Sequence, residues 1–421
     1  MPIRRNKAVT DDQLRALLDR YVADTTVAAE GVLQFNSHET DELERMLPDA
    51  FEADPRFTRR QVRHMLREAL RTTRKTGQLN PDRLNKEAKR IASERLAAPL
   101  RPFTMWTKFR ANQMAFNPGF MVSWNGVEIE TVNDLPDALY VESYFLNGHG
   151  EICPNQPEFF GHLIARGEAR DLDSAADLLI DAMDVFMGLF NLYAVYEGWS
   201  IGSNLACEGK LWAGPYHFPF DGETFVGDQQ VWFDPFYDEE VWGLSALDMP
   251  TVHKVLPRVE KAMATLADSP VRDLLLSVLR PMQDGMIARD EKIALLRYWA
   301  ALEQLYGDPG SRNRDYKRIT QRATFAETDR VVAKLKLAHI ASHRHEYVHV
   351  GSSDDDLRVM SQHLRRLLSR HVNYILFFAP WVQTHQDWLD FVDLPDEIAT
   401  LEADKEMIER RLQLIRQHET D

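Results

Sequence analysis

The stretch EKIALLRYWAALEQLYG, residues 291–307, decides the fold class of the C-terminal half of the chain. Apolar residues fill most of it, and it closes at Gly307, a residue that commonly follows the last turn of a helix. The stretch therefore predicts one strongly apolar helix. From about residue 252 the chain predicts helices to its end, separated by short breaks that contain Pro or Gly.

Three more helices are predicted after this stretch. Residues 327–349 form the first, which carries the apolar residues Val331, Val332, Leu335, Leu337 and Ile340. Residues 355–378 form the second, with acidic residues at the N-terminal end, where the helix dipole favours negative charge. The third covers residues 395–417 and is heavily charged, so we expect it on the surface.

The N-terminal region also predicts helices, among them residues 11–33 and residues 58–75. The apolar side of residues 58–75 consists of Val62, Met65, Leu66 and Leu70. Arginines recur three and four residues apart in the same segment and so line one stripe, namely Arg60, Arg63, Arg67, Arg71 and Arg74. Pro81 suits the first turn of a further helix.

Positive charge is concentrated in this region. Residues 55–110 hold 16 Lys and Arg against 4 Asp and Glu, in a chain whose formal net charge is −15. Such a concentration can address a polyanion, so the arginine stripe is a candidate RNA-binding surface. The alternative is a stripe that is solvated or paired with acidic groups of the same chain.

The middle of the chain changes character. Residues 101–165 are rich in β-branched and aromatic residues, and Asn125-Gly126 lies between two strand-like runs, which predicts a hairpin. Residues 171–198 predict a helix capped by Asp173 or Ser174. Residues 199–245 predict strands and loops. Six tryptophans could stack on bases, although core packing is favoured for them: Trp106, Trp124, Trp199, Trp212, Trp232 and Trp242.

We therefore expect a mainly α protein with an α+β middle region. The predicted domains are a helical N-terminal region (1–100), an α+β domain (101–250), a helical bundle (251–385) and a C-terminal helix (386–421). The two cysteines, Cys153 and Cys207, provide no disulfide framework. With no signal-peptide pattern and an apolar run at 185–196 that is too short to span a bilayer, we expect a cytoplasmic protein without membrane contact.

Two common catalytic motifs are disfavoured. Gly198-Trp199-Ser200-Ile201-Gly202 fits the nucleophile elbow of serine hydrolases, but that turn follows a strand, whereas a long helix is predicted here. Phosphate-binding loops rich in glycine do not occur in the sequence.

The segment HRHEYVHVG, residues 343–351, fits two catalytic patterns. His345-Glu346-x-x-His349 is the helix signature of zinc proteases, with two ligands one turn apart and Glu346 as general base. A third ligand is required, and the extended form of the motif does not follow. Arg344 would also place a permanent positive charge beside the metal. The zinc hypothesis therefore stays open as the weaker one.

The second pattern is Arg344-x4-His349. A guanidinium can hold two phosphate oxygens and stabilise a pentacoordinate transition state. A histidine titrates near neutral pH and can move a proton to or from the ribose 2′-hydroxyl or the leaving oxygen. Since RNA carries its own nucleophile, no metal is required. Residues 344 and 349 lie about 140° apart on a regular helix, so we expect the helix to end or loosen at 348–351.

Residues 285–380 resemble the HEPN superfamily, and within it the Apea-like HEPN domains of bacterial defence proteins. The resemblance covers roughly a quarter of the chain. Four features carry it: the apolar helix with its Leu302-Glu303 pair, the spacing to a helix with an arginine near its start at Arg322, the motif Arg344-His345-x-x-x-His349, and Gly351 soon after it. His345 departs from the Asn or Asp that is commoner at this position in the family.

The resemblance implies an up-down helical bundle that dimerises so that two Arg-x4-His motifs share a cleft. It further implies a metal-independent endoribonuclease without cofactor, in an anti-phage, abortive-infection or toxin-like system, cutting tRNA or mRNA after a trigger such as a phage or release from an antitoxin. In this interpretation Arg344 stabilises the phosphorane, His349 is the general acid or base and His345 assists. Glu303 could hold Arg344 in place by a charge-assisted bond, or it could cap or brace the bundle. The alternatives are an inactive HEPN-like sensor that only dimerises, and the zinc protease.

Overall fold

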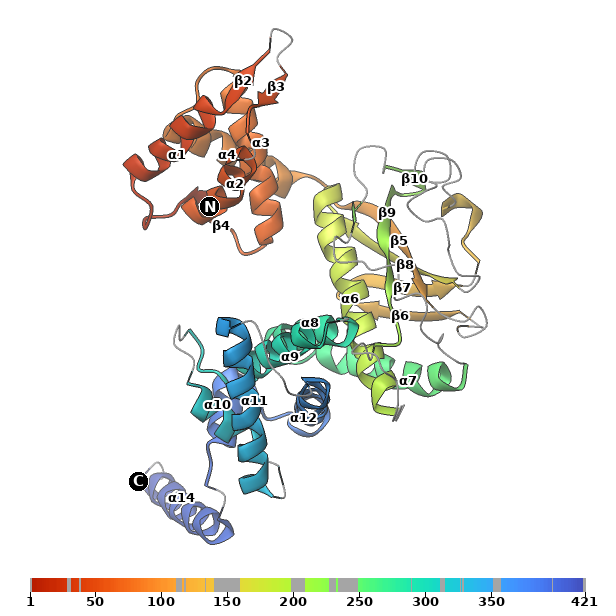
Figure 1. Cartoon of the computed structure of the whole chain (residues 1–421), viewed down its shortest axis with the longest axis vertical. Helices are drawn as coiled ribbons and strands as arrows, with labels where there is room; N and C mark the ends of the chain where they lie inside the picture. The colour runs from red at the N-terminus through yellow and green to blue at the C-terminus, as the bar shows by residue number, and fades with distance from the viewer. Residues whose placement is uncertain are drawn as a thin grey trace.

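The structure is a computed structural model. It describes residues 2–28, 32–37, 39–110, 116, 119–132, 134–139, 160–197, 209–226, 232–233, 249–288, 290–310, 315–325, 327, 329–350, 357–395 and 397–418. These residues form 13 α-helices and a seven-stranded antiparallel sheet (Figure 1). The predicted fold class, mainly α with an α+β middle region, is confirmed at this level.

Residues 2–97, the N-terminal unit, form a compact helical body. Its helices are α1 (Asp11–Ala23), α2 (Glu39–Met46), α3 (Arg59–Lys75) and α4 (Pro81–Ala97). Thr58 and Asn80 cap α3 and α4 as N-caps, and the predicted apolar side of α3 is buried. Two short strand pairs complete it, β1 (Ile3–Arg5) with β4 (Phe51–Ala53), and β2 (Thr25–Val27) with β3 (Leu33–Phe35).

The prediction of one helix over residues 11–33 is wrong beyond Ala23. Asp24 ends α1, and Thr25, Thr26 and Val27 pair with β3 as a hairpin strand. These three residues are β-branched, and such side chains lose rotamer freedom in a helix but fit a strand. The three- and four-residue spacing of apolar residues in this segment was therefore not enough to keep it helical.

The middle region is built on the antiparallel sheet. Its strand order is β10-β9-β5-β8-β7-β6. Strand β11 pairs with Tyr216 and His217 of β9, whereas β10 pairs with Phe220 and Asp221. The strands are β5 (Arg101–Arg110), β6 (Phe120–Trp124), β7 (Val127–Val132), β8 (Phe160–Ala169), β9 (Ala213–Asp221), β10 (Thr224–Phe225) and β11 (Trp232–Phe233). The β6–β7 turn confirms the predicted hairpin: Asn125 and Gly126 have φ values of 49° and 80°, as a tight two-residue turn requires.

Helix α6 (Leu172–Glu197) packs across one face of this sheet (Figure 1). Its apolar run is buried, as predicted, from Val185 to Ala194. The predicted caps are wrong by two or three residues. Asp171 is the cap, since its carboxylate accepts a hydrogen bond from the backbone of Ser174 at 2.7 Å. Asp173 is thereby left for contacts outside the helix.

The C-terminal part is helical throughout its described residues. Its elements are α7 (Met249–Ala267), α8 (Arg272–Ile287), α9 (Glu291–Tyr306), α10 (Tyr316–Ala323), α11 (Arg330–Val350), α12 (Leu357–Phe378), α13 (His385–Val392) and α14 (Ile398–His418). Helix α9 is the predicted apolar helix, and it packs against α8 and α12. One apolar cluster runs from Phe103 in the sheet to Val392 in α13, so the predicted boundary at residue 250 falls within a continuous core.

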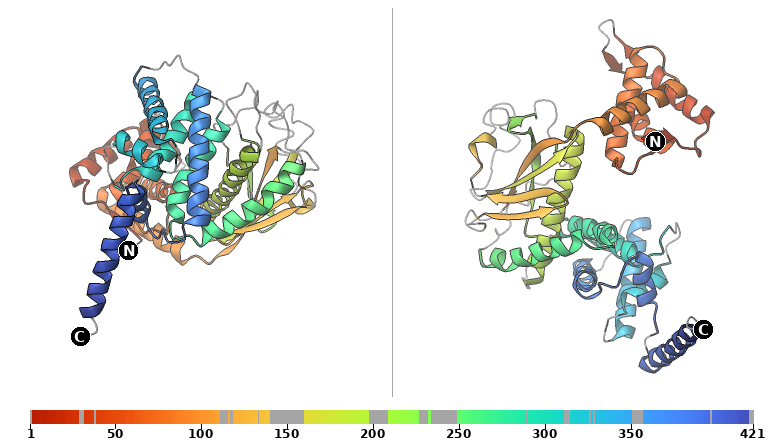
Figure 2. Two further views of the ribbon diagram at one scale, coloured as in Figure 1. Left: turned by 90° about the horizontal axis from the view of Figure 1, so that it is seen from below. Right: turned by 180° about the vertical axis from the view of Figure 1, so that it is seen from behind.

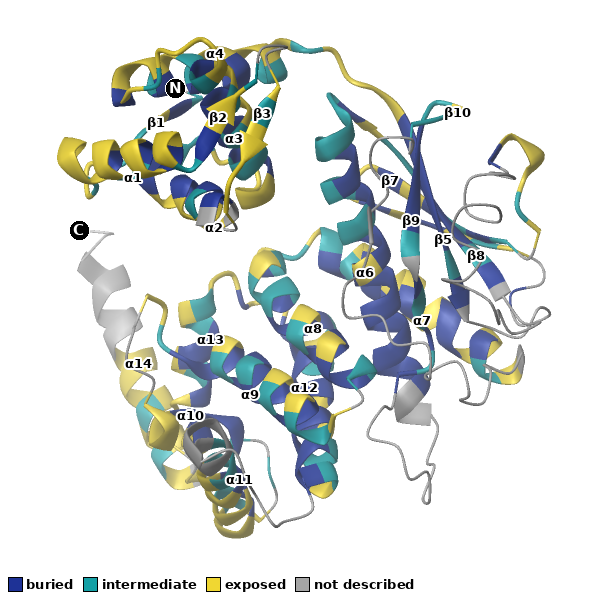
Figure 3. Cartoon of the chain, turned by 45° about the horizontal axis from the view of Figure 1, so that its top comes forward, coloured by how far each residue is buried: buried dark blue, intermediate teal, exposed yellow. Residues whose placement is uncertain are grey.

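Two helices are only lightly covered. Helix α11 contacts α9 and α10, but Val331, Val332 and Leu335 are 71%, 42% and 66% exposed, while Leu337 and Ile340 are buried (Figure 3). Helix α14 projects from the other helices, and its described side chains are almost all exposed, as its charge predicted (Figure 2). No helix in the described ranges is long and apolar enough to cross a membrane.

Candidate functional site

Arg344 lies on α11 and is held on two sides by the protein. Its Nη1 donates a hydrogen bond of 2.9 Å to the hydroxyl of Tyr316, and its guanidinium carbon lies 5.1 Å from the centre of the same ring. On the other side, Nη2 lies 3.5 Å from Oε1 of Glu303. Glu303 therefore lies within ion-pair distance of Arg344, and Tyr316 is a partner that the sequence did not indicate.

Glu303 is fixed in turn by its own helix. The indole nitrogen of Trp299, one turn earlier on α9, donates a 2.7 Å hydrogen bond to the same carboxylate oxygen. The ring of Trp299 is buried and lies 6.0 Å from that of Tyr316, in an edge-on arrangement. These four residues form a closed ring of contacts, the Arg344 cluster: Trp299, Glu303, Tyr316 and Arg344.

The elements of the cluster are positioned by caps and by a buried arginine. Asp290 caps α9, and Asp315 caps α10, which puts Tyr316 in its first position. Arg322, at 1% exposure, binds Asp393 through two hydrogen bonds of 2.8 and 2.7 Å and Asp308 through one of 2.9 Å. Arg322 thus ties α10 to the ends of α9 and α13. It lies near the end of α10, not near its start as predicted.

The Arg344 cluster holds one positive and one negative charge in a semi-buried setting. Arg344 and Glu303 are 21% and 16% exposed. Nε of Arg344 is buried and has no hydrogen-bond partner among the described atoms. A guanidinium that is kept in one orientation by a carboxylate and a hydroxyl can bind an oxyanion such as a phosphate.

His345 and His349 lie on the backbone of α11, and their side chains are outside the described part of the structure. The helix stays regular to Val350, one residue beyond His349, and Gly351 lies outside the described residues. The helix therefore ends within the predicted interval but does not loosen before His349. At the helical period, the backbone positions 344 and 349 are about 140° apart around the axis of α11.

Metal binding at this segment stays a prediction. Among the described residues no group of three or more His, Cys, Asp or Glu is arranged to hold a metal. The side chains of His345, Glu346 and His349 do not belong to that set. His339 and His343 pack edge to face at 4.4 Å between ring centres, one turn apart on the same helix.

The arginine stripe does not form one open surface. Arg67 and Arg71 both bind the buried carboxylate of Glu44, at 2.5 and 3.1 Å. Arg74 donates to the hydroxyl and the carbonyl of Thr25. The two remaining members differ: Arg60 lies 3.5 Å from Asp177 on α6, and Arg63 is half-buried with its Nε inside the protein.

Other candidate residues of the middle region have mixed outcomes. Trp106 and Trp124 are buried in apolar clusters, which confirms core packing for both. Trp212 donates to the carbonyl of Gly209, and Trp232 is described only in its backbone. Trp199, Trp242, both cysteines and the Gly198–Gly202 motif lie outside the described residues.

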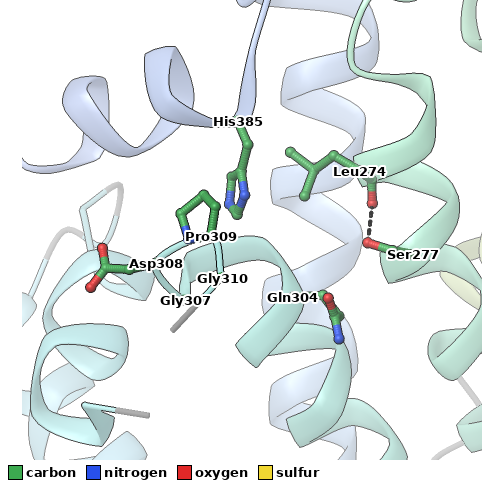
Figure 4. Close-up of a pocket in the computed structure, with 8 residues that line it drawn as sticks. All are labelled: Leu274, Ser277, Gln304, Gly307, Asp308, Pro309, Gly310 and His385. Atoms are coloured by element: carbon green, nitrogen blue, oxygen red, sulfur yellow. Dashed lines mark hydrogen bonds between the residues drawn. The ribbon is translucent and has the colours of Figure 1, made fainter. Parts of the chain in front are cut away.

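A pocket of about 310 Å³ lies at the C-terminal end of α9 (Figure 4). His385 points into it opposite Leu274 and Pro309, while the carboxylate of Asp308 is directed away. That carboxylate binds Arg322 and Arg318 instead. The imidazole Nε2 of His385 lies 3.1 Å from the carbonyl of Leu305. The pocket therefore offers a histidine ring between apolar walls but little directed charge.

Buried titratable pairs elsewhere are structural. Nδ1 of His371 lies 2.6 Å from the hydroxyl of Tyr306, inside a cage of aromatic rings that includes Phe325. Burial, with the charge of Arg370, lowers the pKa of His371 to about 3. Burial likewise lowers the pKa of His217 to about 4. Both imidazoles are closed off from solvent, so neither can serve a substrate.

Comparison with known proteins adds no assignment to this geometry. The sequence matches no protein-family model and no curated protein, and the fold matches no solved structure.

Proposed function

We propose that this chain is a HEPN-type, metal-independent endoribonuclease that cleaves RNA through attack by the 2′-hydroxyl. The observation that carries the proposal is the Arg344 cluster. The arginine of the Arg-x4-His motif lies 3.5 Å from the carboxylate of Glu303, which belongs to the Leu-Glu pair of the predicted apolar helix. An arginine held in this way is a suitable clamp for a phosphodiester.

Each residue of the motif has a role in this proposal. Arg344 binds the non-bridging oxygens and stabilises the charge that develops on the phosphorane. His349 moves the proton of the 2′-hydroxyl or of the leaving 5′-oxygen, and His345 assists. Glu303 and Tyr316 keep the guanidinium in place, since an unrestrained arginine side chain would lose rotamer entropy on binding the phosphate.

A homodimer is part of the proposal. The backbone positions of Arg344 and His349 lie about 140° apart around α11, so the proposal assigns the two groups that act on one phosphate to different chains of a dimer. A second copy alongside α11 would supply the missing group and would form the HEPN-like bundle interface. The exposed apolar row of α11, which consists of Val331, Val332 and Leu335, supports such a contact.

Biologically, the proposal is an RNase of a defence or toxin-like system whose RNA target is tRNA or mRNA and whose trigger is a phage component or loss of an antitoxin. A second function, an inactive HEPN-like sensor, is favoured by one observation. Arg344 is already occupied by Glu303 and Tyr316, as a purely structural arginine would be. The two functions predict different effects of Arg344→Ala on RNA cleavage.

The test is cleavage of bulk tRNA and mRNA, with and without EDTA. Wild type is compared with Arg344→Ala and His349→Ala, and with Glu346→Ala as the variant that only a zinc protease should be sensitive to. We expect EDTA-resistant cleavage that both Arg344→Ala and His349→Ala abolish. Cleavage that survives Arg344→Ala, or that EDTA removes, counts against the proposal. An unchanged dimer with no cleavage in any form favours the sensor.

A further inference from the structure

The N-terminal unit is joined to the rest of the molecule by polar contacts. Its apolar cluster, Ile3 to Ala92, and the cluster that starts at Phe103 share no residue in the described part of the chain. The connection between them passes through the exposed residues Pro99 and Leu100 (Figure 3). Polar interfaces of this kind within a chain usually permit the domains to move relative to each other.

Two aspartates at the start of α6 contact the N-terminal unit. Asp173 lies 3.0 Å from Nδ1 of His64 and 3.4 Å from Nη1 of Arg95. Arg95 also lies 3.7 Å from Asp171, immediately before the helix. Although burial raises the pKa of Asp173, its hydrogen bond from His64 and the charge of Arg95 outweigh this and leave that pKa below its ordinary value.

Asp177, one turn further along α6, is the second of the two. It accepts a hydrogen bond from the hydroxyl of Thr58 and lies 3.5 Å from Nη1 of Arg60. On the N-terminal unit, the residues that meet these aspartates form a single surface, the docking face: Thr58, Arg60, His64 and Arg95.

The docking face has the composition of a phosphate-binding surface. Guanidinium and hydroxyl groups are among the side chains that contact the phosphates of nucleic acids, and an imidazole N–H can donate to the same oxygens. The carboxylates of Asp173 and Asp177 are spaced one helical turn apart, so their Cβ atoms are about 5–6 Å from each other on one side of α6. They present the docking face with a row of two anions.

The rest of the arginine stripe cannot serve in the same way. Arg67 and Arg71 share the buried carboxylate of Glu44, and their release would leave that charge without partners inside the N-terminal unit. Arg60 and His64 instead face a partner across a polar interface, with 42% and 28% of their side chains exposed. Their contacts with the two carboxylates lie at this interface, where another polyanion can compete for the same donors.

We propose that the docking face binds the phosphates of an RNA strand, and that Asp173 and Asp177 occupy it when no RNA is bound. The identity of the polyanion as RNA rests on the proposed function. The structure is then the closed form, in which α6 holds the N-terminal unit. When RNA binds the docking face it displaces the two aspartates, so the N-terminal unit separates from α6. The bound RNA then stays close to the C-terminal helices that carry Arg344.

The test measures RNA affinity in full-length protein that carries Arg344→Ala, so that cleavage does not interfere. A labelled single strand of about 20 nucleotides is titrated at about 0.1 M salt, where electrostatic differences remain visible. Asp173→Asn with Asp177→Asn removes the two competing charges. The matched control, Asp268→Asn with Asp273→Asn, removes two exposed charges elsewhere.

We expect the Asp173/Asp177 variant to bind RNA about five- to tenfold more tightly than the matched control. Addition of Arg60→Ala and Arg95→Ala should abolish that gain. If the double variant folds poorly, the single variants Asp173→Asn and Asp177→Asn provide the same comparison with smaller gains. Affinity equal to the control, or a gain that survives loss of the two arginines, overturns the inference.

Small-angle scattering distinguishes RNA binding by the docking face from a weakened contact between the N-terminal unit and α6. An N-terminal unit that detaches in the double variant without any gain in RNA affinity assigns these contacts to domain docking alone and overturns the inference. The proposed function fails separately. If wild type cuts no RNA while the double variant gains affinity for RNA, RNA binding by the docking face is supported and the proposed nuclease function is contradicted.

Discussion

The guanidinium of Arg344 is fixed from both sides before any substrate is present. Glu303 provides charge, and Tyr316 provides a hydrogen bond and a ring surface. Such partners favour one orientation of a long side chain that would otherwise sample many. The proposed role of Arg344 therefore depends on Glu303 and Tyr316 as much as on the Arg-x4-His motif itself.

Glu303→Gln should lower RNA cleavage by about tenfold, because it removes the charge that orients Arg344 while it keeps the shape and the contact with Trp299. Tyr316→Phe should have a smaller effect, since the ring remains under the guanidinium. Single-turnover cleavage rates check both variants. Glu260→Gln, on an exposed position of α7, is the control and should leave the rate unchanged. Equal cleavage rates for Glu303→Gln and wild type would contradict a role of Glu303 in orienting Arg344.

His371 makes stability depend on pH. Its pKa is about 3 in the folded protein and about 6.5 when exposed, so only the unfolded chain takes up a proton in between. This contribution to stability is complete above about pH 6.5 and is lost as the pH falls toward 3, by at most about 1.4 kcal/mol per pH unit.

Melting temperatures between pH 7.5 and 5 test this, with His371→Gln as the comparison. The variant is expected to be less stable at neutral pH, because the hydroxyl of Tyr306 loses its partner. Its melting temperature should nevertheless fall less steeply with acid than that of wild type. An identical slope in both proteins would show that another group titrates.

At the scale of elements, α10 is anchored by Arg322 and not by apolar area alone. The hydrogen bonds of this guanidinium also hold the pKa of Asp393 below its ordinary value. Arg322→Met should cost about 2–3 kcal/mol of unfolding free energy, because it breaks a buried cation's bonds to Asp393, Asp308 and the carbonyl of Tyr306. Arg318→Ala, on the exposed side of the same helix, should cost less than about 1 kcal/mol.

Urea denaturation measures both costs. Equal losses for Arg322→Met and Arg318→Ala would contradict the assignment of Arg322 as the anchor. Because α10 carries Tyr316, the Arg322 variant should also release Arg344 from its ring contact. A loss of cleavage larger than the loss of folded protein would report that second effect.

Helix α11 is the element for which a partner is expected. Leu335→Glu places a charge in the exposed apolar row, which a dimer interface would bury at a cost of several kcal/mol. Light scattering coupled to gel filtration should show a shift from dimer to monomer. Ile408→Glu, on the exposed helix α14, is the matched control and should leave the dimer intact. A dimer that Leu335→Glu leaves unchanged would place the interface elsewhere.

The same elements show what a single sequence can establish. Local signals located α3, α4, α9 and the β6–β7 hairpin, because a cap, a Gly or an apolar period lies within each segment. The β2–β3 hairpin was missed, since its apolar spacing also fits a helix. Tyr316 was missed as well: it comes close to Arg344 only through the fold of α10, and no residue near it in the sequence signals that contact.

At the scale of the whole molecule, long-range pairing is what the sequence leaves undetermined. Strand β5 pairs with both β8 and β9, which follow it by more than fifty and a hundred residues, and no local pattern encodes that order. The arginine stripe is a similar case. Its periodicity was visible, but whether Glu44 or Asp177 would neutralise it depends on how the N-terminal unit folds and docks.

The central claim is that Arg344 and His349 cut RNA through its own 2′-hydroxyl. The most direct measurement is mass spectrometry of the ends left on a defined RNA after incubation with wild-type protein in EDTA. We expect 2′,3′-cyclic phosphate on one fragment and a 5′-hydroxyl on the other, with neither formed by Arg344→Ala. Ends that carry a 5′-phosphate, or intact RNA under every condition that supports dimerisation, would contradict it.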